Sequence, residues 1–352
     1  MQAEKLLLTN FQSVGDVLML TRAVADLKAA YPHDYEIHVN TGHPEIWNNN
    51  PNVILEQISP HATVEGMRRV ACHYPVINHS NRLPRHFVEA FHRYLEIVLN
   101  RPIPIREFRG DIYLSEQEKN EYPVLGTDGE PLLYWVVVAG GKHDFSAKWT
   151  IPGYIEDALT IVRNTIGPGK IKFVQIGQAV HWHPRLKHPD VIDRIGQTNI
   201  RDVLQLIYHC DGVLCPVTFA MHAAAAVPIK RPPFEFEEEL PPSASENLRP
   251  GGPLRPCVVI AGGREPAHWE RYPGHRFLEN VGALPCCSYG GCWRSRAQKI
   301  GDGDGKDTTG LCLNPVQHGE FVFAKCISMI RPAMIADAML SYYDGGALEV
   351  PK

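Results

Sequence analysis

The N-terminal segment constrains the fold most strongly, because it reads as a strand, a tight turn and a helix. Residues 5–9 form a short apolar run, residues 10–16 are a polar turn, and residues 17–31 repeat apolar side chains at helical spacing. Gly15 permits a sharp turn, and Asp16 stands where the N-cap of the helix is expected. A carboxylate there lies at the carboxyl end of a strand, the edge where open α/β sheets bind ligands. Asp16 therefore either caps the helix only or faces a ligand.

The predicted first helix is amphipathic. Leu20, Val24 and Leu27 fall on one stripe, with Arg22 and Asp26 off it.

Composition limits the class of protein. The 352 residues are enough for two domains, and the contents of 44% hydrophobic and 21% charged residues are typical of a globular protein. A formal net charge of −4 gives no electrostatic reason to expect a nucleic-acid partner. No apolar run approaches the roughly 20 residues that span a bilayer, and the N-terminus lacks a signal-peptide pattern. We expect a cytoplasmic protein without a transmembrane segment.

Strand-like and helix-like segments continue to alternate along the chain, which indicates parallel α/β architecture. The expected strands are residues 35–39, 132–139, 171–176, 212–215 and 257–261, and the expected helices are residues 86–99, 151–166, 202–209 and 221–227. The polar stretch 116–130 is the predicted interdomain linker. We predict an N-terminal domain over residues 1–125, a C-terminal domain over 131–330, and a terminal helix and tail over 331–352.

Within the predicted C-terminal domain, the proline-rich and acidic stretch 228–256 is interpreted as an exposed insertion. A solvated loop and a lid or partner-docking loop are the two alternatives.

Three loops that follow predicted strands carry residues suited to an anion. Gly140, Gly141, Lys142 and Lys148 follow the strand 132–139, and such a loop suits a diphosphate, although solvated lysines on a glycine turn are the alternative. In the second loop, Thr218 is a predicted helix cap, and His222 either bonds a substrate group or is structural. In the third, Arg264 either reaches a diphosphate or an acidic acceptor, or forms a surface ion pair with Glu265. Neither a Walker A motif nor a G-x-G-x-x-G fingerprint occurs.

Five of the nine cysteines gather in the segment 286–326. We predict four thiolate ligands for a structural zinc or iron ion, with Cys286 as an alternative first ligand; the four are Cys287, Cys292, Cys312 and Cys326. Buried free thiols and redox pairing are the alternatives, since the spacing lacks a C-x-x-C pair.

Several segments together resemble the heptosyltransferase-like glycosyltransferases of family 9. The similarity lies in residues 13–21 and 27–32, in the 41–53 unit, in Lys148-Trp149, and in the late strand–loop–helix segment 211–228. The resemblance implies a GT-B fold, in which two Rossmann-like domains with parallel sheets face a central cleft. It also implies inverting transfer from a nucleotide diphosphate sugar, with ADP-heptose as the leading candidate.

The resemblance assigns the catalytic base to Asp16 and a diphosphate contact to Lys148. Including the residues singled out above, the predicted donor-binding set is Gly15, Gly141, Lys142, Lys148, Gln178, Thr218, Met221, His222 and Arg264. This chain departs from the family where Val217-Thr218-Phe219 replaces the usual Asp-Thr-Gly.

Inverting transfer needs a carboxylate that takes the proton of the acceptor hydroxyl, and cationic groups that stabilise the leaving diphosphate. Helix N-termini, Lys142 and Lys148 are expected to do the latter, so no cofactor is expected to be needed for catalysis. The acceptor is a glycan, a protein or a small molecule. Two alternatives stay open: a sugar-nucleotide epimerase or hydrolase with the same fold, and a non-catalytic, metal-stapled binding protein.

Overall fold

The chain forms two α/β units. The computed structural model describes residues 3–59, 65–73, 81–229, 255–344 and 347–348. The first unit comprises Met1–Glu121 and Ala225–Leu254, and the second comprises Tyr122–Ala224 and Arg255–Lys352. Most of the predicted insertion 228–256 lies outside the described residues.

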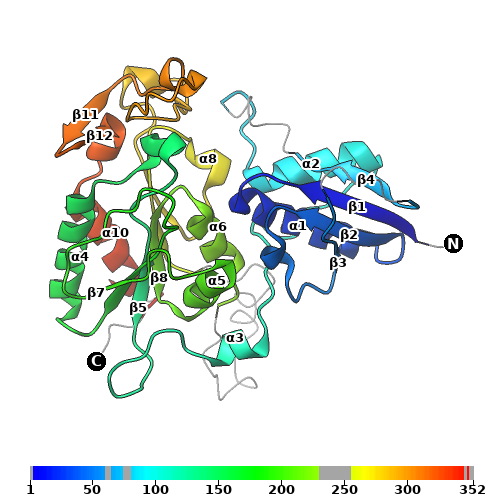
Figure 1. The fold of residues 1–352 in the computed structure, drawn as a ribbon, viewed down its shortest axis with the longest axis horizontal. Helices are drawn as coiled ribbons and strands as arrows, with labels where there is room; N and C mark the ends of the chain where they lie inside the picture. Colours follow the sequence, from blue (N-terminus) through cyan, green and yellow to red (C-terminus); the bar gives the residue numbers. More distant parts are fainter. Residues whose placement is uncertain (1–2, 60–64, 74–80, 230–254, 345–346, 349–352) are drawn as a thin grey trace. The chain divides into compact units, whose positions relative to one another are not determined.

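The sheet of the first unit has four parallel strands in the order β3-β2-β1-β4 (Figure 1). The strands are β1 (Glu4–Asn10), β2 (Tyr35–Thr41), β3 (Ile54–Leu55) and β4 (Arg68–Ala71). The helical segments are α1 (Val14–Ala30), the 3-10 helix η1 (Pro44–Trp47), α2 (Phe87–Leu99) and α3 (Glu116–Asn120). The predicted strand 35–39 and helix 86–99 are confirmed, whereas β3 and β4 are too short for periodicity to indicate them.

The sheet of the second unit has six parallel strands in the order β10-β9-β8-β5-β6-β7. These are β5 (Tyr134–Val137), β6 (Lys172–Gln175), β7 (Val191–Asp193), β8 (Gly212–Pro216), β9 (Cys257–Gly262) and β10 (Arg276–Glu279). The helices are α4 (Pro152–Ile166), α5 (Ile200–His209), α6 (Phe219–Ala226), α8 (Ala267–Glu270), α9 (Lys325–Ser328) and α10 (Pro332–Asp344). The 3-10 helices η2 (His143–Lys148), η4 (Pro285–Cys287) and η5 (Gly305–Asp307) and the hairpin of β11 (Pro315–His318) and β12 (Phe321–Ala324) complete the unit.

Central strands of the second sheet are buried on both faces. Every residue of β5, β8 and β9 is buried, which explains their near-continuous apolar sequences. Helix α10 packs against α4 and β9, and its Ile335, Ala336 and Met339 join the core of this unit. All six predicted strands, the N-terminal run 5–9 included, are confirmed within a few residues of their expected ends.

Helix α1 differs from its predicted amphipathic form, because it is buried nearly all round. Arg22 and Asp26, expected off the apolar stripe, are 7% and 1% exposed. Asp26 receives a 2.7 Å ion pair from Arg22 and a 2.8 Å contact from His92 of α2. Burial alone would raise the pKa of Asp26, but His92 and Arg22 lower it, so the carboxylate stays charged.

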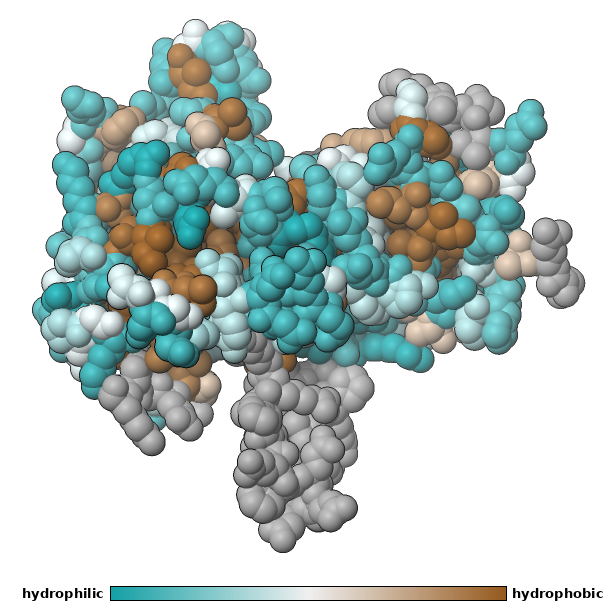
Figure 2. Space-filling model, turned by 60° about the horizontal axis from the view of Figure 1, so that its bottom comes forward, coloured by the Kyte–Doolittle hydropathy of each residue, from teal (hydrophilic) through white to brown (hydrophobic). Residues whose placement is uncertain are grey.

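No helix among the described residues is long and apolar enough to cross a membrane. The face drawn in Figure 2 is mostly hydrophilic, and its apolar residues gather in separate patches.

The buried Asp26 pair leads to a stability prediction. Replacing Asp26 with Ala leaves the Arg22 guanidinium buried without its partner, which costs about 3–5 kcal/mol. Urea unfolding should show this loss. Glu116→Gln, which breaks an exposed pair with Lys119, should cost less than about 1 kcal/mol. Equal losses in the two variants would contradict the role of the buried pair.

Candidate functional site

The carboxyl edge of the six-stranded sheet gathers most of the residues predicted to bind the donor. Because the strands are parallel, the loops that follow them emerge at one edge. Strand β5 leads to η2 and Lys148, β6 to Gln178, β8 to Thr218 and α6, and β9 to Arg264.

Lys148 is held by a carboxylate that the sequence did not mark as part of the site. Its Nζ lies 2.9 Å from Oε1 of Glu265, and Arg264 forms an ion pair with the same oxygen. The expected surface pair of Arg264 and Glu265 is in fact buried, since the two residues are 7% and 5% exposed. Arg264 also donates from Nε to the carbonyl of Arg294 at 2.6 Å, and its guanidinium lies 5.4 Å from the ring of Phe145. We call Lys148, Arg264 and Glu265 the cation cluster.

Glu265 stays ionised in the cation cluster. Burial raises the pKa of its carboxyl group, but the charges of Arg264 and Lys148 outweigh burial and lower it below its usual value. Two cations around one carboxylate leave the cation cluster with one net positive charge.

The loop of Gly140 and Gly141 packs against the segment of Trp182, a contact that was not predicted. The N–H of Gly141 donates to the carbonyl of Trp182 at 2.8 Å, and Trp182 returns a 3.1 Å bond to Gly141. A Cβ at Gly140 would lie 1.9 Å from that Trp182 carbonyl oxygen. Glycine at 140 therefore permits the approach of the Trp182 segment, and the predicted Gly141 donor is already paired. Lys142 and Gln178 are exposed.

Helix α6 begins directly after Thr218, whose carbonyl accepts the N–H of Met221 at 3.1 Å. His222 is 4% exposed, and its Nδ1 lies 2.8 Å from the hydroxyl of Tyr272. Burial raises the pKa of Tyr272 well above its usual value, so the hydroxyl keeps its proton. When that hydroxyl donates to Nδ1, the proton of His222 resides on Nε2, which becomes a donor. Nothing in the sequence near position 272 indicated this contact.

Asp16 lies in the first unit, and its predicted place in the helix is wrong by three residues. Ser13 is the N-cap of α1, so Gly15 and Asp16 lie within the first helical turn. The Ser13 N–H donates to Oδ2 of Asp16 at 2.9 Å, which is one half of a capping box. The sequence did not distinguish the two positions, because an acidic residue is favourable both at the N-cap of a helix and three residues into it. The carboxylate is half-buried at the carboxyl end of β1.

Five cysteines line one small cavity of about 10 Å³ in the second unit, and they are Cys286, Cys287, Cys292, Cys312 and Cys326. The Cys287 thiol lies 3.4 Å from the carbonyl of Leu284, which it can bond. The pKa of the Cys292 thiol is raised above its usual value. Burial is the largest cause, and the nearby thiols of Cys286 and Cys312 add to the rise. Among the described residues, no three His, Cys, Asp or Glu side chains already stand at the spacing that would hold a metal ion.

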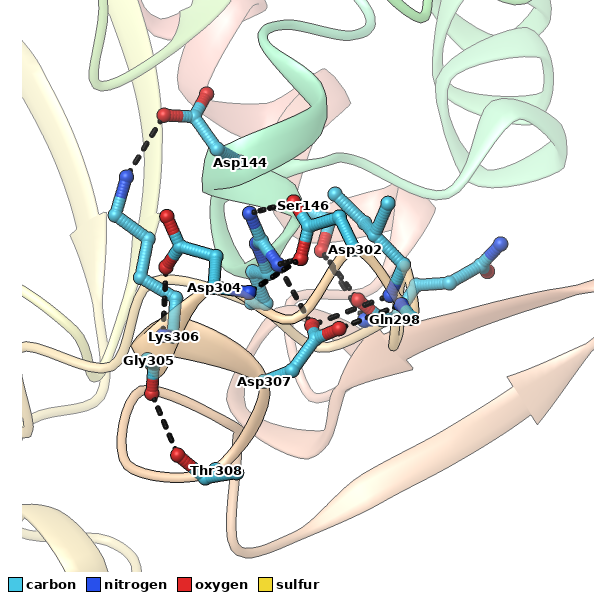
Figure 3. Close-up of polar contacts among 12 residues, drawn as sticks. Asp144, Ser146, Gln298, Asp302, Asp304, Gly305, Lys306, Asp307 and Thr308 are labelled. Carbon is cyan, nitrogen blue, oxygen red and sulfur yellow. Dashed lines mark hydrogen bonds and ion pairs between the residues drawn. The ribbon is translucent and has the colours of Figure 1, made fainter.

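Buried Arg296 orders the glycine-rich and aspartate-rich segment beside the cysteines. It is 2% exposed, and it contacts Asp302 at 2.9 Å and Asp307 at 2.7 Å. Lys306 lies 2.8 Å from Asp144 of η2. Figure 3 shows this pair beside Asp302 and Asp307. An arginine fixed by two carboxylates thus orders this segment locally.

Comparisons with known proteins identify the fold. No protein-family model and no curated protein sequence matches the chain. Solved structures match along nearly its whole length. A family 9 glycosyl transferase from Veillonella parvula is 12% identical, with a TM-score of 0.55 and coverage of 96% of both chains. E. coli ADP-heptose LPS heptosyltransferase II is 12% identical, with a TM-score of 0.54, covering 97% of this chain and 100% of that one. The chain has the GT-B fold.

A third GT-B structure extends the comparison. The iron-containing dodecameric glycosyltransferase TibC from enterotoxigenic E. coli is 14% identical, with a TM-score of 0.58 and coverage of 98% of this chain and 77% of that one. The predicted fold class, and the predicted likeness to family 9 at the level of the fold, are confirmed.

The Arg296 centre predicts a pH dependence within this GT-B chain. Burial raises the pKa of Asp307, but bonds from Arg296 and from the N–H groups of Ile300 and Gly301 lower it to about 2. Because the folded pKa lies below the ordinary value of 3.8, the stabilisation is complete above that value and is lost as the pH falls toward 2.

Asp307→Asn should therefore lower the thermal unfolding midpoint at pH 7. The difference from wild type should shrink between about pH 4 and pH 2. Asp304→Asn, in the same segment but exposed, is the control and should change the midpoint little. A difference for Asp307→Asn that stayed constant with pH would contradict the charge-based explanation.

Proposed function

We propose that the protein is an inverting glycosyltransferase that moves a sugar from a nucleotide diphosphate sugar to an acceptor hydroxyl. One observation carries the proposal: a GT-B chain places a positively charged cluster, a helix start and a buried histidine at the carboxyl edge of one sheet. These groups suit the diphosphate of a donor. Several of the matching structures are named heptosyltransferases, and one of them is a complex of TibC with ADP-D-β-D-heptose. ADP-heptose is therefore the leading candidate for the donor.

In this proposal, Asp16 is the general base. Its carboxylate takes the proton of the acceptor hydroxyl as the oxygen attacks the anomeric carbon, and the bond from that carbon to the donor diphosphate breaks. Lys148 stabilises the charge that develops on the leaving diphosphate, assisted by the start of α6 and by His222. We expect this stabilisation to need no divalent cation. The acceptor is a glycan, a protein or a small molecule that offers a hydroxyl group.

The decisive experiment compares Asp16 with a carboxylate in the same structural position elsewhere. Asp16→Asn should lower the transfer rate by about 10²–10⁴-fold, because general base catalysis is lost. Its ADP affinity should stay within about twofold of wild type, since ADP lacks the reacting hydroxyl. Transfer is measured as ADP release from ADP-heptose in the presence of acceptor, and affinity by calorimetry.

Asp202 is the matched control. It is the third residue of α5, and it accepts the N–H of its cap residue Asn199 at 2.9 Å, as Asp16 does from Ser13. Asp202→Asn should reproduce any loss of capping stability and retain transfer. If both variants keep transfer, Asp16 is only a cap; if wild type releases ADP equally fast without acceptor, the protein is a sugar-nucleotide hydrolase. A thermal-shift screen with ADP-, UDP-, GDP- and dTDP-sugars identifies the donor class.

We also propose that the thiol cavity binds a structural zinc or iron ion. The four thiolate ligands would be Cys286, Cys292, Cys312 and Cys326, with Cys286 in place of the predicted Cys287. One observation favours Cys286 over Cys287, which lines the same cavity: the Cys287 thiol has backbone carbonyls within bonding reach. Four thiolates are a ligand set that zinc and iron both accept, and TibC is described as iron-containing. Binding would draw the thiols together and release their protons.

Elemental analysis tests this assignment. Wild type and Cys287→Ser should each contain about one metal ion per chain, and Cys286→Ser should contain far less. The reverse result would restore Cys287 as the ligand. Absence of metal from the purified wild type would contradict the site altogether.

A further inference from the structure

Glu265 joins the loops of two strands that are not neighbours in the sheet. Lys148 ends η2, which follows β5, and Glu265 follows β9. Strand β8 lies between β5 and β9, and it leads into Thr218 and α6. The contact from Glu265 to Lys148 thus ties together the loops on both sides of the start of α6.

The turn that carries Glu265 is itself fixed. Gly262 has a φ of +64°, which favours glycine, and a Cβ there would lie 2.9 Å from the side chain of Ile327. The carbonyls of Gly263 and Arg264 accept the N–H groups of Cys292 and Trp293 at 3.2 and 3.1 Å. The backbone at 262–265 therefore has little freedom, and neither does the carboxylate that extends from it.

The exposed charge of the cation cluster belongs to Lys148. Its side chain is 24% exposed, whereas those of Arg264 and Glu265 are 9% and 6% exposed. A lysine on its flexible stem would otherwise sample many rotamers, and binding a ligand would have to order it. With Glu265 holding one side of the ammonium and Arg264 balancing the carboxylate, Lys148 keeps a net positive charge toward solvent.

We propose that Glu265 is a positioning residue for the donor diphosphate, which holds the Lys148 ammonium in place before the donor binds. This inference rests on the proposed function, and it adds a residue to the donor site. Glu265 is also a carboxylate at the carboxyl edge of the sheet, in the loop after β9. The loop after β8 has Val217-Thr218-Phe219 and no acidic residue.

A second buried carboxylate in the same unit provides a matched control. Asp190 is 6% exposed and binds one arginine and one lysine: its Oδ2 lies 2.6 Å from Nε of Arg163, and it also pairs with Lys172. Asp190 precedes β7 and Lys172 begins β6, so this cluster lies at the amino edge of the sheet, opposite the candidate site. A purely structural role would affect Asp190 and Glu265 variants alike.

The test measures ADP binding to the full chain by calorimetry, together with thermal unfolding. Glu265→Gln keeps the shape of the side chain and removes its charge, and it should weaken ADP binding about tenfold. Lys148→Ala should weaken binding at least as much. Adding Glu265→Gln to Lys148→Ala should cause no further loss, because Glu265 acts through the lysine. Asp190→Asn should lower the unfolding midpoint and leave ADP affinity unchanged.

Should Glu265→Gln fail to fold, Glu265→Asp keeps the charge but shortens its reach, and it should still weaken ADP binding relative to wild type. Unchanged or tighter binding by a folded Glu265 variant would overturn the inference, and so would a full additional loss in the Lys148→Ala background. If wild type binds none of ADP, UDP or GDP, the proposed donor class fails instead, and the positioning role fails with it.

Discussion

Parallel strand pairing is the constraint on which the rest of the second unit depends. Six strands that run in one direction bring the loops after β5, β6, β8 and β9 to a single edge. Residues more than a hundred positions apart, such as Lys148 and Glu265, can then form one ion pair. Strands β5, β8 and β9 are buried on both faces, so the polar groups of the candidate site lie in the loops at the carboxyl edge of the sheet.

The fold was largely predictable from the sequence, because long apolar runs and helical periodicity both report burial, and burial dominates this architecture. Strands such as β3 and β7 were missed, since two or three residues carry no period. The prediction of an exposed side on helix α1 was wrong. Arg22 and Asp26 are charged residues, which are usually exposed, but here they are buried. They can be buried because they form an ion pair with each other and because His92 also contacts Asp26.

The candidate site was predictable only for residues that follow strands directly. Lys148, Thr218 and His222 were singled out because a loop after a buried strand has a known place in an α/β sheet, and the structure places all three at that edge. Glu265 was considered only as a surface partner of Arg264, since adjacent opposite charges are usually solvated. Its pairing with Lys148 depends on two loops meeting, which no local pattern encodes. No local pattern distinguishes Cys286 from Cys287 as the proposed metal ligand either, because adjacent residues differ only in where the backbone directs each thiol.

Arg264 contributes to two neighbouring features of the second unit. Its side chain belongs to the cation cluster, and the same residue forms part of the wall of the thiol cavity. In the proposal above, this residue would border both a metal site and a donor site: if a metal ion in the cavity changes the affinity of the edge for an anion, the anion changes the affinity of the cavity for the metal by the same factor. If both proposed sites are used, a substitution at positions 262–265 would affect both, and these positions should tolerate fewer changes than other loop positions.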